Sequence, residues 1–591
     1  MIDAQDLNWD LTPLIGNNSI SSLLVIVEDL KNQLKVLKGQ LFSSKDNFAS
    51  FLSLIEKFYR ISSEIECYLQ NKSNSNLQDI QTQKVYQDWS LKYQKIASDL
   101  FFIRNEIFAS ETKINEYLND EKFSYLKNYF HNFFNFKKHR LSDENEQLIS
   151  QLSGIFDNNK NIFTKLTNAD FKFRKIKDSN HKSYELLPGN ASFFLSHKDI
   201  ELRKNCYKNF WKVYFDHRFT LATNAFYNLL STSKFAKIYH YKSSLESNTL
   251  SDYVDKKQYK FILKNISDNT NLILEWKKIL VKVTKITNPN PWDWSGPLFE
   301  ASNDDFTIEE SKKIIKKSLS LLGPEYLKEI DYVFENNLID WLPRPNKRSG
   351  AYSYCVYQKN PYILLNWNKK YLDVSTLTHE LGHAIHSIFS NRHQSFFYHD
   401  YPIFLAEIAS ITNEILLNHS MIENTKDDEK KKAYLELFIK EFIATVFRQA
   451  QFAEYELIAH DMVDKDNSLT YTDFVKIAKK LNKKYFPKLE TEKKSHKFNY
   501  LWPLYVPHFY SNFYVYKYVV GMVCASCFAK KIIDKEKDAV KNYLNFLKSG
   551  SSKKPLEILK ENGIDLTTEQ PFKNAFSLFN DYLVKLKKLV N

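Results

Sequence analysis

Glycine is scarce in this chain, with 11 residues in 591, and cysteine is rarer, with five. Few glycines leave few positions for tight turns, so long helices are favoured over many short strands. Five cysteines are too few for the dense disulfide framework of a small secreted protein. The chain also lacks an apolar run of about 18 residues, the length that a membrane-spanning helix needs. These shortages predict a mainly α-helical protein with no membrane partner.

The first residues, MIDAQDLNWDLTPL, show neither the basic segment nor the apolar core of a secretory signal peptide. We therefore expect a cytoplasmic location. The formal net charge is +13, but lysines alternate with acids, as in IIDKEKDAVKN at 532–542. A nucleic-acid-binding protein more often gathers its basic residues on one element. We expect no nucleic-acid partner; the alternative would show as salt-sensitive binding to DNA or RNA.

The length favours two lobes over one compact domain. Leucines and valines at steps of three and four predict an amphipathic helix over 19–42, with Ser19 or the preceding asparagines as candidate caps. The same periodicity predicts a helix over 46–70. The polar run NKSNSN at 71–76 is expected to break the chain before the next helix.

A boundary is expected near LLPGNASFF at 186–194, which carries the only Pro-Gly pair of the chain. It would separate an N-terminal helical region, 1–190, from the remainder, 191–591. Within the second region, 349–368 is rich in Tyr, Val and Ile in partly alternating order. This pattern predicts a small antiparallel pair of strands.

The segment TLTHELGHAIHSIFS at 376–390 holds three of the 15 histidines of the chain. On a helix, His379, His383 and His386 fall within about 60° of one another, with apolar residues on the opposite arc. The spacing His379-Glu380-x-x-His383 suits two imidazoles that bind one zinc ion and a carboxylate that takes a proton from water. A core helix with awkward polar neighbours is the alternative, and Gly382, which leaves room near the backbone, favours the metal.

A catalytic zinc site needs a third protein ligand and an open position. Position 389 is Phe, so the longer histidine motif of the metzincins is absent. His386 is one candidate, but it lies more than about 10 Å along the helix axis from His379. A carboxylate from the downstream segment YPIFLAEIASITNEILL closes the geometry better, which favours Glu407. Glu414, on the same helical face, could orient a ligand histidine.

The segment VPHFYSNFYVYKYVVG at 506–521 combines His508 with four tyrosines: Tyr510, Tyr514, Tyr516 and Tyr518. Imidazole and phenol groups can donate to the oxyanion that forms when a metal ion polarises a carbonyl. Most buried tyrosines, however, simply bond to a carbonyl. On spacing alone, both interpretations stay open.

Taken in order, DVSTLTHELGHAIHS, AEIASITNE and PHFYSNFYVYKYVVG resemble the oligoendopeptidase F group of the M3 family of zinc metallopeptidases, in the thimet oligopeptidase clan. Three further segments are also typical of that group: LNWDLTPL, KRSGAYSY and KSGSSKKPLEILKENGIDL. The resemblance therefore spans nearly the whole chain. It places the oligopeptidase F N-terminal region in 1–190 and the M3 catalytic region in 191–591.

The resemblance implies a two-lobed helical clam that encloses a deep channel, with one zinc ion at its floor and a small antiparallel β element next to the zinc helix. It implies a metalloendopeptidase that cleaves internal bonds of short, unstructured oligopeptides. His379, His383 and Glu407 match the metal ligands, and Glu380 matches the catalytic glutamate. The expected assembly is a monomer or a weak homo-oligomer.

By the same resemblance, His508 and a following tyrosine match the donors that stabilise the transition state. Tyr514 is the first choice for this role, and Tyr510, the second, is otherwise expected to contact substrate. The segment Gly350, Ala351 and Tyr352 is expected to bind substrate as a strand.

The chain departs from the family at Ser349 and at 549–552, which line or hinge the channel there, so the resemblance does not carry over to peptide preference or channel closure. A peptide-binding scaffold with an inactive metal site is a second hypothesis. The presence of Glu380 argues against it, because a structural site needs no base.

Overall fold

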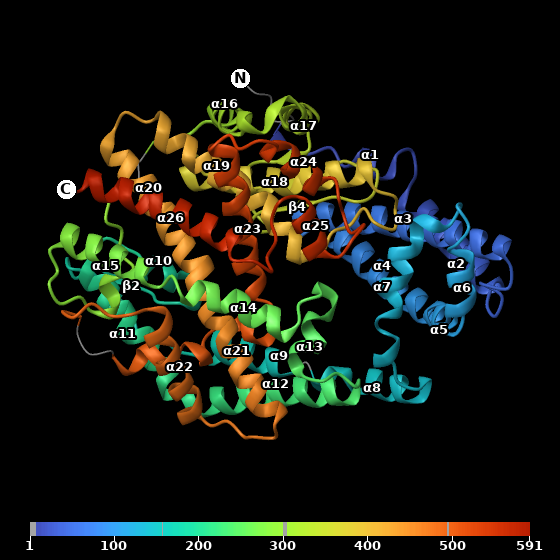
Figure 1. Ribbon diagram of the computed structural model, residues 1–591, viewed down its shortest axis with the longest axis horizontal. Coiled ribbons are helices and arrows are strands. Elements are labelled where there is room, and N and C mark those ends of the chain that lie inside the picture. The colour runs from blue at the N-terminus through green and yellow to red at the C-terminus, as the bar shows by residue number, and fades with distance from the viewer. Residues whose placement is uncertain (1–6, 157, 300–303, 493–495) are drawn as a thin grey trace. The chain divides into compact units, whose positions relative to one another are not determined.

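The computed structural model describes residues 7–156, 158–299, 304–492 and 496–591 (Figure 1). The chain forms two compact units, each assembled from three separate segments. Unit 1 comprises Met1–Lys138, Asn303–Leu417 and Lys531–Gly563, and unit 2 comprises His139–Ser302, Asn418–Lys530 and Ile564–Asn591. Helices dominate both units, which confirms the mainly α prediction. The channel and the boundary near residue 190 stay predictions.

The helices of unit 1 are α1 (Thr12–Ile15), α2 (Ile20–Val36), α3 (Lys45–Ser75), α4 (Ile80–Asp99), α5 (Phe102–Ala109), α6 (Glu111–Tyr117), α7 (Lys127–Phe134), α16 (Ile308–Leu319), α17 (Gly323–Glu335), α18 (Tyr371–His393), α24 (Ala539–Leu547) and α25 (Pro555–Glu561). Helix α2 matches the predicted amphipathic helix. Ser19 is its cap, because its side chain accepts a hydrogen bond from the backbone N–H of Ser22.

The helices of unit 2 are α8 (Asp143–Phe156), α9 (Asn158–Lys165), α10 (Ala191–Leu195), α11 (Ile200–Asp216), α12 (Arg218–Ile238), α13 (Ser244–Thr249), α14 (Lys256–Ser267), α15 (Asn271–Thr284), α20 (Asp428–Phe442), α21 (Gln449–Asp464), α22 (Tyr471–Tyr485) and α26 (Gln570–Leu589). Helix α19 (Ile403–Asn424) begins in unit 1 and ends in unit 2, and α23 (Tyr516–Ile533) runs the other way.

The predicted chain break at 71–76 is wrong, because helix α3 continues through Ser75. Its polar residues are held inside the unit by tertiary hydrogen bonds. Asn71 and Asn74 are buried, and both bond to the hydroxyl of Tyr352, at 2.8 and 2.9 Å. The polar run therefore supports contact with a distant strand rather than a turn.

The strand pair predicted in 349–368 is present in unit 1 as β4 (Tyr352–Tyr354) and β5 (Tyr362–Leu364), which pair antiparallel. A third strand, β3 (Ile339–Asp340), pairs parallel with β5, so the strand order is β3-β5-β4. Both β4 and β5 pack against α18, in agreement with the β element that the resemblance implied beside the histidine helix. Strand β4 lies at the edge of this sheet. Unit 2 holds a second antiparallel pair, β1 (Ile176–Lys177) and β2 (Ser183–Tyr184).

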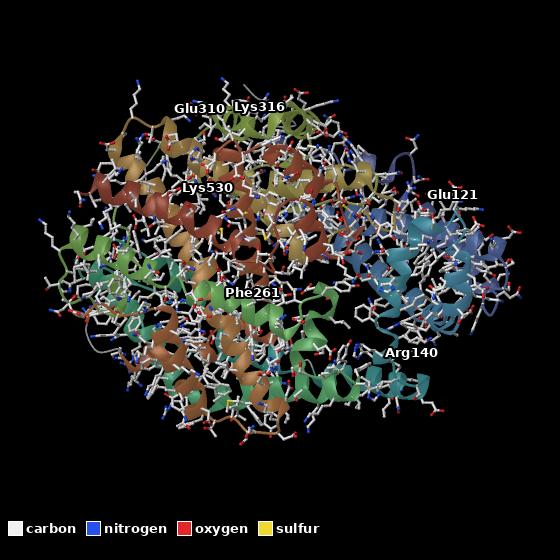
Figure 2. All side chains as sticks on the ribbon, in the orientation of Figure 1. Glu121, Arg140, Phe261, Glu310, Lys316 and Lys530 are labelled. Atoms are coloured by element: carbon white, nitrogen blue, oxygen red, sulfur yellow. The ribbon has the colours of Figure 1, made fainter. Side chains whose placement is uncertain are left out.

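Charged side chains cover many of the helices, and basic and acidic groups are interspersed (Figure 2). Two of the lysines labelled there have acidic partners: Lys316 lies 2.5 Å from Asp331, and Lys530 lies 3.3 Å from Asp581. Over the described ranges, no helix combines the length and the apolar character that crossing a bilayer requires.

Candidate metal centre

Helix α18 has two different faces. One face is apolar and buried. It consists of the residues expected from the periodicity: Leu377, Leu381, Ala384, Ile385 and Ile388. On this helix Gly382 permits a close approach to α19, because a Cβ atom there would lie 2.5 Å from the Cα atom of Ser410. The absence of a side chain at one position thus brings the two helices together.

His379 and His383 of α18 meet Glu407 of α19. The Nε2 atoms of the two histidines lie 3.5 and 3.6 Å from Oε2 of Glu407. One donor atom from each of the three residues lies within 4.8 Å of the other two. Ligand atoms of a tetrahedral zinc site with bonds of about 2.0–2.1 Å lie roughly 3.4 Å apart. The spacing around Glu407 fits such an ion, and this is the one such cluster among the described residues.

Glu414 holds one of the imidazoles in place. Its Oε2 lies 3.0 Å from Nδ1 of His379, and its Oε1 accepts a hydrogen bond from Ser375 at 3.1 Å. The contact between Glu414 and a candidate ligand histidine is the one expected from the sequence. With Nδ1 bonded to a carboxylate, Nε2 is the ring nitrogen that points to Glu407 and is available to a metal ion.

The two histidines differ in their proton affinity. Burial, the largest single effect, lowers the pKa of His379. The hydrogen bond and charge of Glu414, together with the charges of Glu380 and Glu407, outweigh burial and raise this pKa to about 9. The pKa of His383 is lowered to about 4 by burial and by the positive charge of His379. A metal ion requires both Nε2 atoms without a proton, so metal binding is expected to release a proton from His379.

Glu380 is a buried carboxylate beside the cluster. Only 7% of its surface is exposed, and in the described part of the chain its Oε2 has no hydrogen-bond partner. Burial raises the pKa of Glu380 to about 7. A carboxyl group with such a pKa can accept and return a proton near neutral pH.

His386, the alternative third ligand, lies elsewhere. It is buried, and its ring stacks on Tyr401 with a centroid distance of 3.6 Å. The candidate metal cluster in the described residues contains Glu407 and not His386. The geometry favours the carboxylate, and its role as a ligand stays a prediction.

The segment Gly350, Ala351 and Tyr352 leads into the edge strand β4. Gly350 has a φ of +84°, a left-handed conformation that favours glycine. Tyr352 is fixed through its hydroxyl by the two asparagines of α3. This clamp was not predictable from the sequence, since nothing in a polar run identifies its distant partner.

The segment around His508 belongs to unit 2. The His508 ring lies 6.3 Å from that of Tyr514 and 6.1 Å from that of Tyr518. The other two tyrosines have polar partners: the hydroxyl of Tyr510 accepts from Asn224 at 2.9 Å, and that of Tyr516 bonds to Asp252 at 2.5 Å. Tyr514 thus gathers with His508 and Tyr518, whereas Tyr510 and Tyr516 are held by other elements of unit 2. The catalytic and substrate-binding roles stay predictions.

Glu456 of α21, which is not among the predicted site residues, supports this segment. Its carboxylate accepts a hydrogen bond of 2.7 Å from the backbone N–H of Phe513. Phe513 has a φ of +54°, which is unusual for a residue other than glycine. No local sequence signal distinguishes Glu456 from the surface acids of other helices.

Two histidines and a carboxylate beside a buried glutamate, on two packed helices, are the donor set of a metal-dependent hydrolase. Comparison with known proteins agrees. A model of peptidase family M3 matches residues 193–578, and a model described as oligopeptidase F matches residues 109–173.

The oligoendopeptidase F homolog of Lactococcus lactis subsp. lactis is 33% identical over 608 residues, which cover 99% of this chain and 98% of that protein. Among solved structures, a Chlamydophila abortus protein is 28% identical, with a TM-score of 0.91 over 99% of this chain and 98% of that chain. Oligoendopeptidase-F from Enterococcus faecium is 26% identical, with a TM-score of 0.73 over 96% and 98%.

The chain belongs to peptidase family M3 and is a metallo-oligopeptidase. The resemblance to the oligoendopeptidase F group that the sequence suggested is confirmed. The family implies a divalent metal ion, and His379, His383 and Glu407 are the described residues whose geometry suits one.

Proposed function

We propose that this protein is a zinc-dependent endopeptidase that hydrolyses internal peptide bonds of short, unstructured oligopeptides. The observation that carries the proposal is the convergence of His379, His383 and Glu407 within 4.8 Å, with the buried Glu380 next in sequence to one of the imidazoles. A structural metal site needs no such neighbouring base.

Two imidazoles and one carboxylate suit a single Zn²⁺ ion with an open coordination position. When bound there, zinc would polarise the scissile carbonyl and lower the pKa of a water molecule toward about 7. His379 and His383 would hold the ion through Nε2, and Glu414 would keep the His379 ring in the required orientation.

Glu380 is the proposed general base and acid. It would take a proton from the attacking water and then pass it to the leaving amine. Its pKa of about 7, raised by burial, suits both transfers near neutral pH.

His508 and Tyr514 are the proposed donors to the oxyanion of the tetrahedral intermediate, with Tyr510 as the second choice for the tyrosine. Donors of this kind contribute by matching charge that develops only in the transition state. The ring cluster of His508, Tyr514 and Tyr518 favours Tyr514 over Tyr510, whose hydroxyl is bonded to Asn224.

Gly350, Ala351 and Tyr352 are the proposed substrate contacts. An extended peptide could add to the open edge of β4 through main-chain hydrogen bonds, which recognise a peptide without strict sequence preference. This mode suits short unstructured substrates. A cytoplasmic location, a monomeric or weakly associating state and the absence of nucleic-acid or membrane partners stay predictions.

The decisive experiment is the variant Glu380→Gln, assayed on internally quenched peptides and analysed for metal content. We expect cleavage to fall by at least about 10³-fold while bound zinc stays near one ion per chain, because the side chain keeps its shape and loses its basicity. Glu557→Gln, at an exposed position, is the matched control. Chelation should abolish cleavage by the wild-type chain, and zinc should restore it. Retained turnover in Glu380→Gln would refute the assigned role, and peptide binding without wild-type cleavage would favour the scaffold hypothesis.

A further inference from the structure

Unit 2 contains a cavity of about 1120 Å³, large enough for a ligand of several rings. Its walls include residues of α11, α15, α21 and α22, of the π-helical turn Ile443–Arg448, and of the segments 289–295, 486–492 and 498–505. None of the residues proposed for catalysis, metal binding or substrate contact lines it.

The walls are rich in aromatic rings. Five of the nine tryptophans of the chain line this one cavity: Trp211, Trp276, Trp292, Trp294 and Trp502. They come from segments far apart in the sequence, so the fold gathers them. Indole rings offer flat apolar surfaces and stack well on other rings. The lining therefore suits a ligand with an aromatic body.

The charged groups of the lining are mostly of one sign. Among the described lining residues, five side chains are basic and one is acidic: the basic residues are Lys277, Arg448, Lys479, Lys483 and Lys488, and the acid is Glu492. Lys277 and Glu492 pair with each other at 2.8 Å, and both side chains are buried. Without this pair, Arg448, Lys479 and Lys483 still give the described lining an excess of positive charge, which favours an anionic ligand.

Arg448 gives this excess a fixed position. Its guanidinium carbon lies 4.0 Å from the centroid of Phe486, and its Nη1 donates to Oε1 of Gln451 at 2.8 Å. Gln451 is held in turn by Asn482, whose side-chain oxygen also accepts from the indole of Trp502. Among the described residues, no carboxylate pairs with Arg448. Arg448 is partly buried. A partly buried cation without a counter-charge is costly, so an anion that entered the cavity would gain a strong partner.

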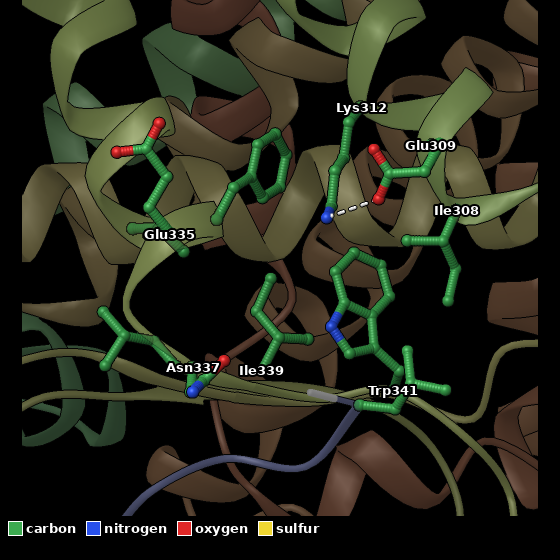
Figure 3. A pocket seen from close by; sticks show the side chains of 11 residues that line it. Ile308, Glu309, Lys312, Glu335, Asn337, Ile339 and Trp341 are labelled. Atoms are coloured by element: carbon green, nitrogen blue, oxygen red, sulfur yellow. Dashed lines mark hydrogen bonds and ion pairs between the residues drawn. The ribbon is translucent and has the colours of Figure 1, made fainter. Parts of the chain in front are cut away.

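The pocket of unit 1 in Figure 3 provides a contrast. It is smaller, at about 390 Å³, and its lysine, Lys312, is paired with Glu309 at 2.8 Å (Figure 3). Glu335 also lines this pocket, so acids outnumber bases there. The positive excess in unit 2 is therefore a local feature of that cavity and does not simply repeat the net charge of the chain.

We propose that the cavity of unit 2 binds an aromatic compound that carries a carboxylate or a phosphate. The anionic group would pair with Arg448, and the aromatic body would stack among the tryptophans. Two sources share this chemistry: the free C-terminus of a peptide that ends in an aromatic residue, and a nucleoside monophosphate. The site is additional to the proposed metal centre.

Isothermal titration calorimetry on the full chain tests this proposal with two anionic probes, N-acetyl-L-tryptophan and AMP. Their neutral counterparts, N-acetyl-L-tryptophanamide and adenosine, are the matched ligands. We expect saturable binding of at least one anion and binding of its neutral counterpart weaker by about tenfold or more, because the charge-assisted bond is lost. The anion that binds identifies the source. Saturable binding of neither anion, or equal binding of both members of a pair, overturns the proposal.

Variants locate the binding. The variant Arg448→Gln should lower the affinity for the anion by about tenfold or more. The control variant Lys312→Gln, in the pocket of Figure 3, should leave this affinity unchanged. Should Arg448→Gln unfold, the double variant Lys479→Gln/Lys483→Gln decides instead, since both lysines are exposed on α22. It should weaken binding about threefold at low salt. Unchanged affinity in the folded variant places the anion outside this cavity and refutes the assignment.

Discussion

Helices α18 and α21 both carry histidine and glutamate one turn apart, yet these side chains make different contacts in the two helices. In α18, His379 and His383 meet the carboxylates of α19 at 3.0 to 3.6 Å. In α21, Glu456 accepts a backbone N–H, and His460 packs its ring 4.7 Å from that of Phe513. The same residue types give a candidate metal centre in one helix and a support for a turn in the other. Converging donors distinguish the two, and residue composition does not.

The two sites also differ in how far solvent reaches their side chains. The side chains of His379, His383 and Glu407 are 20–27% exposed, whereas Glu456 and His460 are each 1% exposed. Burial raises the pKa of Glu380 to about 7 and that of Glu456 to about 8. A shifted pKa therefore marks both helices, and only α18 combines it with donors that a metal ion or a substrate could reach.

The largest effect is expected from breaking the convergence in α18. The variant Glu407→Gln should weaken zinc binding by well over 100-fold, since it removes the only carboxylate from the cluster. His386→Gln is the matched control and should change the affinity little, because His386 stacks on Tyr401. Competition with a chromogenic chelator measures both. The opposite ranking would make His386 the third ligand.

A smaller effect is expected at the residue that orients a ligand. Glu414→Gln should weaken zinc binding by roughly 10–100-fold, which is the usual cost of losing a carboxylate behind a ligand histidine. The same titration measures it, and NMR should show a lower pKa for His379 in the metal-free variant, because the largest contribution that raises it is gone. Unchanged zinc affinity would show that Glu414 does not orient the ring.

The last effect is expected in α21 and concerns stability, with no change in metal binding. The pKa of Glu456 is raised to about 8 from a usual value near 4.5, so the folded chain keeps a proton that the unfolded chain releases. This group therefore favours the folded state at low pH, and its contribution declines between about pH 4.5 and 8, by at most about 1.4 kcal/mol per pH unit.

The variant Glu456→Gln stays neutral at this position at every pH. Its melting temperature should therefore fall less than that of the wild type as the pH rises from 5 to 8. Calorimetric scans at several pH values measure the difference, and zinc content should be unchanged. Parallel curves for the two proteins would mean that Glu456 is ionised in the folded state at neutral pH.

Much of the candidate site on α18 could be predicted from the sequence because it depends on the local spacing of residues. The face shared by His379 and His383 follows from the helical period, and the choice of Glu407 follows from the reach of a second helix. The strand pair in 349–368 was predictable from its composition. In each case the evidence lies within one turn or one hairpin.

The rest depends on long-range contacts that no local pattern reports. The polar end of α3 looked like a loop because its partner, Tyr352, is 278 positions from Asn74. Strand β3 is two residues long, too short to show a periodicity. Arg448 and Glu456 stand out only once the fold surrounds them with aromatic rings or with the turn at Phe513.

The interleaving of the chain has a practical consequence for dissection. Because each compact unit draws on three stretches of sequence, no contiguous fragment contains one unit alone. A deletion that extends past Lys138 from the N-terminal end, or past Ile564 from the C-terminal end, removes parts of both units. A loss of cleavage in such a truncated chain would say little about which residues perform it. Point substitutions, or a split protein reassembled from co-expressed pieces, are better suited to show which residues of this enzyme perform each function.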